Sequence, residues 1–433
     1  MAKMLKMGAI VLGVTIFLAA VFYGLSYQAT KQVVTIFNKT LSGQKMLDGT
    51  LTVGTIRANI FGLVSFENLV WKDEQGRLIA QIASGSFVVK PWDIITKRVE
   101  ASTITNIEIN DGLLCLDFNE RMNLKNINIA KRDKRKTNLS KSGFSSALKD
   151  MNFTMALNHC QLIASYANRE FAMNNVNAQM HMNSKDKFDI DFSAGEFSGT
   201  LEADGLNIVG SINLRPEVAV YDLNLTITAL KPSSLGTGIN VHEKVSVTSK
   251  ISGPLPSPMI DGNLSMKELN LPALHFTNVI GDFHYENAFI NITNVHANVY
   301  GGNCDASGYF NIDNKHYNVD VLGHKLRSDI AAKSLLINCL VELNLKMRGT
   351  GEHKTVLTYG EFKSGKGNYG PIMFDSITGK FSNQYGILRF SDVKIHSDAG
   401  DIYAPLFKII KGKLTLGKVF LYDTKTGENK AFN

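Results

Sequence analysis

Two pairs of residues come closest to the arrangement of a catalytic site. Asp189 and Asp191 flank one apolar residue in FDIDF, and His159 directly precedes Cys160. Two carboxylates can serve as acid and base in glycoside hydrolysis, and a histidine can activate a cysteine nucleophile. Both pairs lie in stretches that read as strands. In a strand the two aspartates share the solvated face, and His159 and Cys160 point to opposite sides, so we expect no enzymatic activity.

Phosphate-binding and metal-binding motifs are also incomplete. The segment GEFKSGKG, residues 360–367, has the spacing of a phosphate loop, but its last glycine stands where a serine or threonine would bind the metal. No helical pattern follows it. The four cysteines lie far apart and form no C-x-x-C pair: Cys115, Cys160, Cys304 and Cys339. We expect buried single thiols, no metal site and no cofactor, although an oxidising compartment would permit any of three disulfide connectivities.

The charge of the chain is modestly basic. A net charge of +7 and a pI near 9.0 are compatible with an anionic partner, but the excess is spread thinly. The densest basic run is KRDKRK, residues 131–136, and small polar residues follow it. Such a run could contact anionic lipid headgroups, yet a solvated loop is the simpler interpretation. Because no aromatic residues are interleaved, we expect no nucleic-acid partner and assign residues 131–150 to a linker or loop.

The N-terminus contains the longest apolar run. Residues 7–25 carry no charge, which is long enough to span a bilayer. Lys3 and Lys6 precede the run, so the positive-inside rule places the N-terminus in the cytoplasm and the bulk of the chain outside it. A cleaved signal peptide is the alternative, but no clear small-x-small site follows the run. We therefore expect residues 1–30 to form a cytoplasmic N-terminus and a transmembrane anchor.

Residues 31–130 form the next expected module. Apolar residues recur at helical spacing from Val33 to Leu41, which predicts a short amphipathic helix. The rest reads as short strands, each closed by glycine, asparagine or aspartate turn chemistry. These strands are LTVGTIRANI (51–60), GLVSFENLVWKD (62–73), RLIAQIASGSFVVK (77–90), TITNIEIND (103–111) and GLLCLDFN (112–119). Strand patterns resume at residue 151 and continue to residue 433.

The region 151–433 contains an internal duplication, with copies at about 245–308 and 343–406. The sequences that start at Gly262 and Gly360 align without a gap at a constant offset of 98 residues. Along this alignment apolar residues match apolar residues, and glycines match glycines. Such repeats are typical of a quasi-linear array, in which each unit buries its apolar face against its neighbours, rather than of a compact enzyme core.

The matched apolar residues are mostly two apart in each strand, which places them on one face of a sheet. Polar residues such as Asn291, Thr293 and His296 then occupy the other face. If the sheet folds into a sandwich, the apolar face is ordinary core; if the sheet stays open, this face is an apolar groove that contacts a ligand or a membrane. The predicted groove residues are Phe276, Val279, Phe283, Ile290, Ile292, Val295, Phe374, Ile377, Phe381, Leu388, Phe390 and Val393.

The segment SGPLPSPMIDG, residues 252–262, has three prolines within five positions. In the second copy Gly351 and Gly360 keep the places of Gly253 and Gly262, but the prolines are absent. The segment therefore predicts a corner within one repeating sheet rather than an interdomain linker. Its glycines would allow the bend, and its prolines would stiffen it and remove backbone donors from a sheet edge.

Residues 51–116 resemble the N-terminal pattern of the AsmA-like superfamily, the AsmA/TamB-type membrane-anchored proteins of the bacterial envelope. The matching positions are Gly62, Val64, Phe66, Asn68 and Leu69, then Asp73 and Gly76, then Ile104, Ile107 and Ile109. A second family pattern, G-x-L-x-x-P-x-x-x-G-x-L, is matched by Gly253, Leu255, Pro258, Gly262 and Leu264. The resemblance covers the anchor, the N-terminal module and the duplicated part, whereas residues 131–230 match only in strand texture.

This resemblance implies a mostly β protein, with an elongated U-shaped repetitive sheet, an apolar groove and an N-terminal transmembrane helix. It also implies a bacterial inner-membrane anchor, a periplasmic bulk, and passive transfer of glycerophospholipids towards the outer membrane, with periplasmic or outer-membrane proteins as further partners. Two alternatives stay open: a non-transporting scaffold that assists assembly of outer-membrane proteins, and, with less support, a periplasmic enzyme built on a β-solenoid. The lipid class and the direction of transfer are not specified by the sequence.

Overall fold

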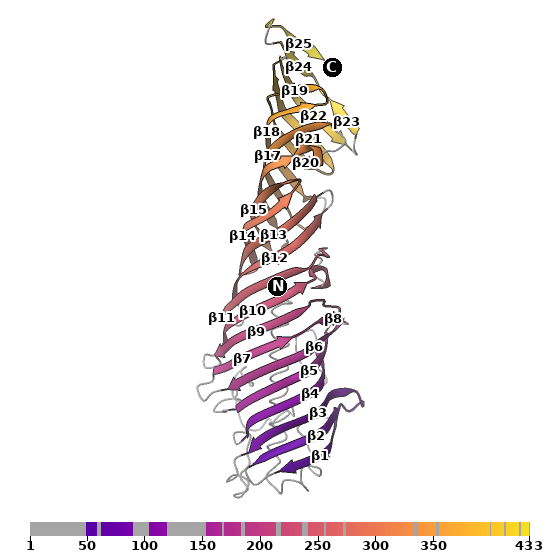
Figure 1. Cartoon of the computed structure of the whole chain (residues 1–433), viewed down its shortest axis with the longest axis vertical. Helices are drawn as coiled ribbons and strands as arrows, with labels where there is room; N and C mark the ends of the chain where they lie inside the picture. Colours follow the sequence, from indigo (N-terminus) through magenta and orange to yellow (C-terminus); the bar gives the residue numbers. More distant parts are fainter. Residues whose placement is uncertain are drawn as a thin grey trace. The chain divides into compact units, whose positions relative to one another are not determined.

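The protein is mostly β (Figure 1). The computed structural model describes residues 49–58, 62–89, 104–118, 153–166, 169–182, 187–213, 218–235, 241–254, 257–271, 274–331, 336–351, 355–398, 400–410, 413–423 and 426–432. Within these ranges no helix is long and apolar enough to cross a membrane. The predicted membrane span at 7–25, the amphipathic helix near 33–41 and the basic run at 131–136 lie outside the described residues.

The chain divides into two compact units, residues 1–258 and 259–433. The division falls inside the proline-rich segment, between Pro258 and Met259. The strands of unit 1 are β1 (Thr50–Ala58), β2 (Leu63–Lys72), β3 (Leu78–Val89), β4 (Ile104–Phe118), β5 (Phe153–Tyr166), β6 (Arg169–Met182), β7 (Lys187–Ala194), β8 (Phe197–Gly199), β9 (Gly205–Asn213), β10 (Val220–Leu230) and β11 (Val245–Pro254), with a 3-10 turn, η2, at Pro232–Leu235.

The strands of unit 1 pair nearly in chain order, so that they form one open sheet. Strands β1 to β4 pair as antiparallel neighbours, and the antiparallel order continues from β5 through β6, β7, β9 and β10 to β11, with the short β8 beside β6. The exception is β4 with β5, which are parallel, with Asn106 opposite Thr154 and Phe118 opposite Tyr166. Parallel neighbours need a crossover connection rather than a hairpin. Residues 119–152, which include the predicted linker, separate β4 from β5 in the sequence and lie outside the described residues.

Unit 2 repeats the same construction with antiparallel neighbours throughout its described pairings. Its strands are β12 (Met259–Leu271), β13 (Leu274–Glu286), β14 (Phe289–Val299), β15 (Gly302–Asn311), β16 (Tyr317–Arg327), β17 (Ile337–Gly349), β18 (Leu357–Tyr369), β19 (Ile372–Phe374), β20 (Ser376–Gln384), β21 (Ile387–Ser397), β22 (Gly400–Ile410), β23 (Lys413–Leu416), β24 (Val419–Tyr422) and β25 (Asn429–Phe432). A four-residue helix, α5 (Ser328–Ala331), lies between β16 and β17.

The strand bounds of unit 2 repeat with the sequence offset of 98 residues. Strand β12 (Met259–Leu271) corresponds to β18 (Leu357–Tyr369), and β14 (Phe289–Val299) corresponds to β21 (Ile387–Ser397). Strand β13 corresponds to β19 and β20 together, since Leu274 and Glu286 match Ile372 and Gln384. The unit is therefore a repetitive β-sheet in which the aligned residues occupy equivalent strand positions.

Single residues in the left-handed conformation interrupt many strands. They are Asn68, Asp111, His159, Asn175, Ala229, Asn278, Asn294, Lys325 and Asp392, with φ between 50° and 54°. Asparagine and aspartate tolerate this conformation best. On either side of each one, residues that share a face are three apart rather than two, as with Phe66 and Leu69 or Ile292 and Val295. The extra residue thus keeps the apolar side chains on one face.

One of these residues corrects an expectation about strand boundaries. The aspartate and glycine in TITNIEIND–GLLCLDFN were expected to close one strand and open another, but β4 runs unbroken from Ile104 to Phe118. Asp111 supplies a left-handed residue inside the strand instead of a turn. The physical reason is that β3 and β5 pair with β4 on both sides of this point and hold the chain extended.

The turn between β2 and β3 is built on a buried carboxylate. Asp73 is 6% exposed, and its Oδ1 accepts hydrogen bonds from the backbone N–H groups of Gln75 at 3.0 Å and Arg77 at 2.7 Å. Arg77 Nε donates to Oδ2 at 2.6 Å. Burial alone would raise the pKa of Asp73, but these hydrogen bonds and the Arg77 charge outweigh it and hold the pKa below its ordinary value of 3.8.

Replacing Asp73 by Ala is expected to lower the free energy of unfolding by about 2 kcal/mol, because two backbone donors lose a charged acceptor. The lowered pKa means that this contribution is present above the unfolded value of 3.8 and is lost as the pH falls through the folded value. Urea unfolding of both proteins at neutral and acid pH measures it. The exposed neighbour provides the control, since Glu74→Ala should change little; equal losses for the two variants would contradict this role.

Candidate functional site

The predicted groove residues share one face of unit 2. Phe283 lies opposite Ile292, Phe381 lies opposite Phe390, and Val393 lies opposite Ala404. The cross-strand row Ala297, Cys304, Gly323, Leu343, Phe362 and Gly379 joins the first copy to the second on this same face. We call this side of the sheet the apolar face of unit 2. All twelve predicted residues belong to it: Phe276, Val279, Phe283, Ile290, Ile292, Val295, Phe374, Ile377, Phe381, Leu388, Phe390 and Val393.

Aromatic rings lie over glycines on the apolar faces of both units. A Cβ added at Gly379 would lie 2.7 Å from Phe362 Cζ, and one added at Gly85 would lie 2.4 Å from Phe66 Cζ. The Phe362 ring also meets Phe390 edge-on at 6.1 Å, and Phe390 stacks on Phe407 at 4.7 Å. A glycine in a strand lets an aromatic side chain from the neighbouring strand lie flat on the sheet. Gly379, one of the glycines matched in the duplication, therefore has a packing role, and at its counterpart Gly281 an added Cβ would lie 2.9 Å from Val295 Cγ2.

The apolar faces of the two units differ in exposure. In unit 1 the face is closed to solvent, with Trp71, Ile79, Ile109 and Met155 each 0% exposed. In unit 2 only Val279, Phe374 and Val393 among the twelve predicted residues are buried, and the other nine are half-buried. Described elements of unit 2 contact chiefly their neighbours within the sheet. No second layer of described elements covers this face, so the sandwich interpretation does not hold for the described part of unit 2.

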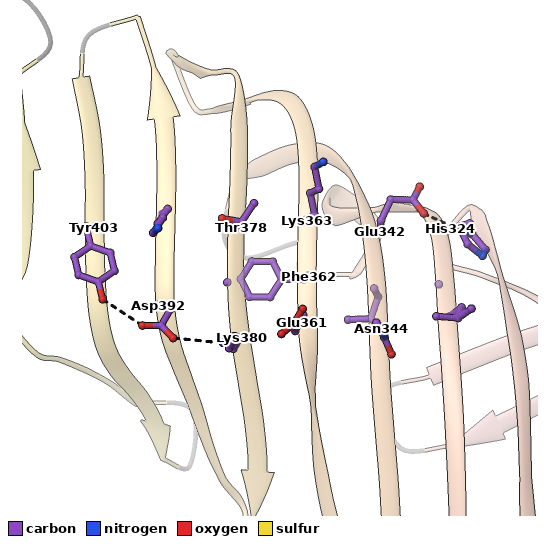
Figure 2. Close-up of a pocket in the computed structure, with 15 residues that line it drawn as sticks. His324, Glu342, Asn344, Glu361, Phe362, Lys363, Thr378, Lys380, Asp392 and Tyr403 are labelled. Carbon is purple, nitrogen blue, oxygen red and sulfur yellow. Dashed lines mark hydrogen bonds and ion pairs between the residues drawn. The ribbon is translucent and has the colours of Figure 1, made fainter.

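The opposite face of unit 2 carries a hollow of about 910 Å³ over strands β16 to β22 (Figure 2). Most of its lining residues are charged or polar: His324, Glu342, Glu361, Lys363, Asn344, Thr378, Lys380, Asp392, Lys394 and Tyr403. The others are Leu322 and four residues of the cross-strand row named above, Gly323, Leu343, Phe362 and Gly379. Asp392 accepts a hydrogen bond from the Tyr403 hydroxyl at 3.2 Å and lies 3.9 Å from Lys380 Nζ. Three lysines and three carboxylates balance one another, so the charge of the hollow does not favour any one class of ligand. Sequence reasoning missed this hollow because its residues come from six strands, β16, β17, β18, β20, β21 and β22.

Histidine and acid side chains pair across this polar face. His296 bonds to Asp305, whose Oδ2 lies 3.5 Å from His324 Nε2, and His324 Nδ1 lies 2.8 Å from Glu342 Oε2. The chain of contacts thus crosses β14, β15, β16 and β17. A backbone hydrogen bond from Lys325 and the contact with His324 lower the pKa of Glu342. These histidine–acid pairs could have been anticipated from the sequence, because histidine and acidic residues recur at the polar positions of neighbouring strands.

A separate pair, His284 with Asp261, offers a test of this electrostatic arrangement. The two side chains approach to 2.6 Å, and this hydrogen bond raises the pKa of His284 above 6.5. Such a pair stabilises the fold below about pH 6.5 and loses its effect as the pH rises through the raised pKa. We expect Asp261→Asn to lower the His284 pKa in an NMR titration. The His396 pKa, which Asp401 raises, should not change; an unaltered His284 titration would contradict the assignment.

The remaining sequence candidates do not assemble into a reactive site. Asp189 and Asp191 lie on β7 on the face opposite its buried residues, and His159 is exposed while Cys160 is buried. The segment 360–367 lies inside β18. Cys160, Cys304 and Cys339 are buried free thiols, and Cys115 is half-buried. No cluster of metal-ligating side chains occurs among the residues with described positions.

Comparison with models of protein families, with curated proteins and with solved structures gives no match. Membership of the AsmA-like superfamily consequently remains a prediction from the sequence motifs. The function has to be argued from the geometry of the two faces of unit 2 and from the expected N-terminal anchor.

Proposed function

We propose that the apolar face of unit 2 carries the acyl chains of phospholipids. The observation that supports this most directly is the half-open face itself: nine of its twelve predicted residues keep partial exposure, while most of the residues that alternate with them are polar. A contiguous apolar surface of this kind on a water-soluble sheet is typical of a binding surface. Its length over two copies suits an elongated apolar ligand better than a compact one.

The proposed mechanism is passive. Exposing each CH₂ of an acyl chain to water costs about 0.8 kcal/mol of free energy. A lipid that moves along an apolar surface avoids most of this cost, so its barrier to transfer is lower. Headgroups would stay in water at the open side. The chemistry requires no catalytic residue and no cofactor. A net direction of transfer would come from a lipid gradient or from a partner that consumes energy.

The proposed setting follows from the sequence. Residues 7–25 would anchor the chain in the bacterial inner membrane, with the strands in the periplasm, and the protein would pass glycerophospholipids towards the outer membrane and so contribute to its biogenesis. The AsmA-like motifs and the uncharged N-terminal run support this setting. Outer-membrane or periplasmic proteins would be its partners at the ends of the route.

Photo-crosslinking in cells tests the proposal with the full chain. A photoreactive phenylalanine analogue at position 381 faces the apolar side, and one at 382 faces the polar side, because Phe381 and Ser382 are successive residues of β20. We expect phospholipid adducts, read by mass spectrometry, at 381 and not at 382. Adducts to unfolded outer-membrane proteins at 381 would instead support the scaffold function, and equal lipid labelling at both positions would contradict the face assignment.

A further inference from the structure

Four of the five most exposed large apolar side chains in the described part of unit 2 lie at one end of its strands. Leu336 is 70% exposed, Met373 is 68%, Ile372 is 60% and Tyr369 is 52%. They come from the start of β17 and from the hairpin that joins β18 to β19. Apart from Tyr385, no other large apolar residue in the described chain is as exposed as the first three of these.

Backbone contacts hold these residues together. Ile337 pairs with Tyr369, Tyr369 pairs with Ile372, and the Gly370 N–H donates to the Leu336 carbonyl at 3.1 Å. Gly370 turns the chain with φ of 53°, and open space surrounds it. The four exposed side chains therefore surround one turn, with Ile372 and Met373 on opposite faces of β19. We call them the apolar tip: Leu336, Tyr369, Ile372 and Met373.

In the first copy, the residues that match Ile372 and Met373 make contacts instead of exposing apolar side chains. Leu274, which matches Ile372, packs against the buried cluster around Val279. The residue that matches Met373 is His275, whose Nδ1 lies 2.5 Å from Asn270 Oδ1. The same fold thus accommodates this hairpin with a packed leucine and a hydrogen-bonded histidine. The exposed apolar pair Ile372 and Met373 is therefore specific to the second copy and not a requirement of the sheet.

On the hairpin that joins β18 to β19, the charged residues stand back from the turn. Residues 367–374, GNYGPIMF, carry no charge, and the nearest charged groups on the hairpin are Lys366 and Asp375, which pair at 3.4 Å. With a rise of about 3.3 Å per residue, Lys366 lies about 10 Å behind the turn. An apolar end, an aromatic ring, and a lysine at that depth match the layers of a bilayer interface, where apolar groups enter to about 5–10 Å.

From this arrangement we propose that the apolar tip inserts into the surface of a phospholipid bilayer. A narrow turn enters lipid readily, whereas a stable protein interface needs about 800 Å² from each partner. The ion pair of Lys366 and Asp375 would remain at the level of the headgroups. The tip would hold the strand ends of the second copy against a membrane. This proposal does not rest on lipid transfer along the apolar face.

Site-specific tryptophan fluorescence of the full chain tests the proposal. In Met373→Trp the added emission should shift to shorter wavelength with phosphatidylcholine vesicles and should be quenched when their acyl chains are brominated. The matched control is Tyr385→Trp, since Tyr385 is 70% exposed at the opposite end of β20. Its emission should show neither change. Spectra of the unchanged chain, which has two tryptophans, provide the baseline.

A second variant separates lipid insertion from other causes. Ile372→Glu in the Met373→Trp background should abolish the quenching, because a charge at the tip opposes insertion. Unquenched emission at 373, equal quenching at 373 and 385, or a short-wavelength emission at 373 without lipid would each overturn the proposal. The last result would show a protein contact. Crosslinking at position 381 reports the apolar face separately, so failure at the tip leaves the proposed function to its own test.

Discussion

Phe381→Asp is expected to lower the phospholipid occupancy of the protein by about 100-fold. A charge among acyl chains costs about 2.5–3.5 kcal/mol, and each 1.4 kcal/mol is a factor of ten in affinity. Phe381 lies opposite Phe390 in the pairing of β20 with β21, next to the ring stack with Phe407. The charge would therefore fall in the aromatic part of the apolar face. Phe283→Asp, its counterpart in the first copy, should act in the same way.

Occupancy is measured by quantitative lipid mass spectrometry after crosslinking at Phe390, with the full chain in membranes. Ser382→Asp places the same charge on the polar face and should leave occupancy unchanged. Phe381→Met keeps the site apolar and should retain most of the lipid, while its thermal unfolding shows whether the position tolerates change. Full occupancy in a folded Phe381→Asp protein would contradict the proposed role of this face.

Gly85→Ala is expected to lower the free energy of unfolding of unit 1 by about 1–3 kcal/mol, the usual cost of overpacking. The added Cβ would lie 2.4 Å from Phe66 Cζ and 2.7 Å from the Glu108 carbonyl oxygen. Phe66 is only 1% exposed and has little room to move. The carbonyl belongs to β4, which pairs with β3 on the far side of the same glycine. Urea unfolding followed by circular dichroism measures the loss.

Gly205→Ala is the matched control for this loss. Gly205 also lies in a strand of unit 1, but a Cβ there would meet the Ala194 carbonyl at 3.6 Å, an ordinary contact. This variant should be neutral or slightly stabilised, because alanine restricts the unfolded chain. Adding Phe66→Leu to Gly85→Ala should recover the part of the unfolding free energy that is lost through the clash with the Phe66 ring. The part lost through the clash with the Glu108 carbonyl oxygen should remain. Equal stabilities of the two alanine variants would show that the ring does not need the glycine.

Part of the fold and part of the candidate site follow from local sequence patterns. The alternation in FINITNVHANV predicted a strand with Ile290 and Ile292 on one face, and the pairing with β13 and β15 places them there. The offset of 98 residues likewise anticipated the repeated strand bounds in unit 2. Period-two reasoning did not anticipate the left-handed residues, since Asn294 and Asp111 look like turn residues in sequence.

The sequence by itself determined that the chain is mostly β, that its second half repeats, and that twelve apolar residues share one face, because side-chain alternation is a local property of a strand. Only the tertiary structure decided that the apolar face of unit 1 is buried and that of unit 2 is half-open, that β4 and β5 run parallel, and that Leu336 meets the turn at Gly370. These features depend on which strands become neighbours. Strand pairing between residues that are distant in the chain determines these features, and local sequence patterns do not specify that pairing.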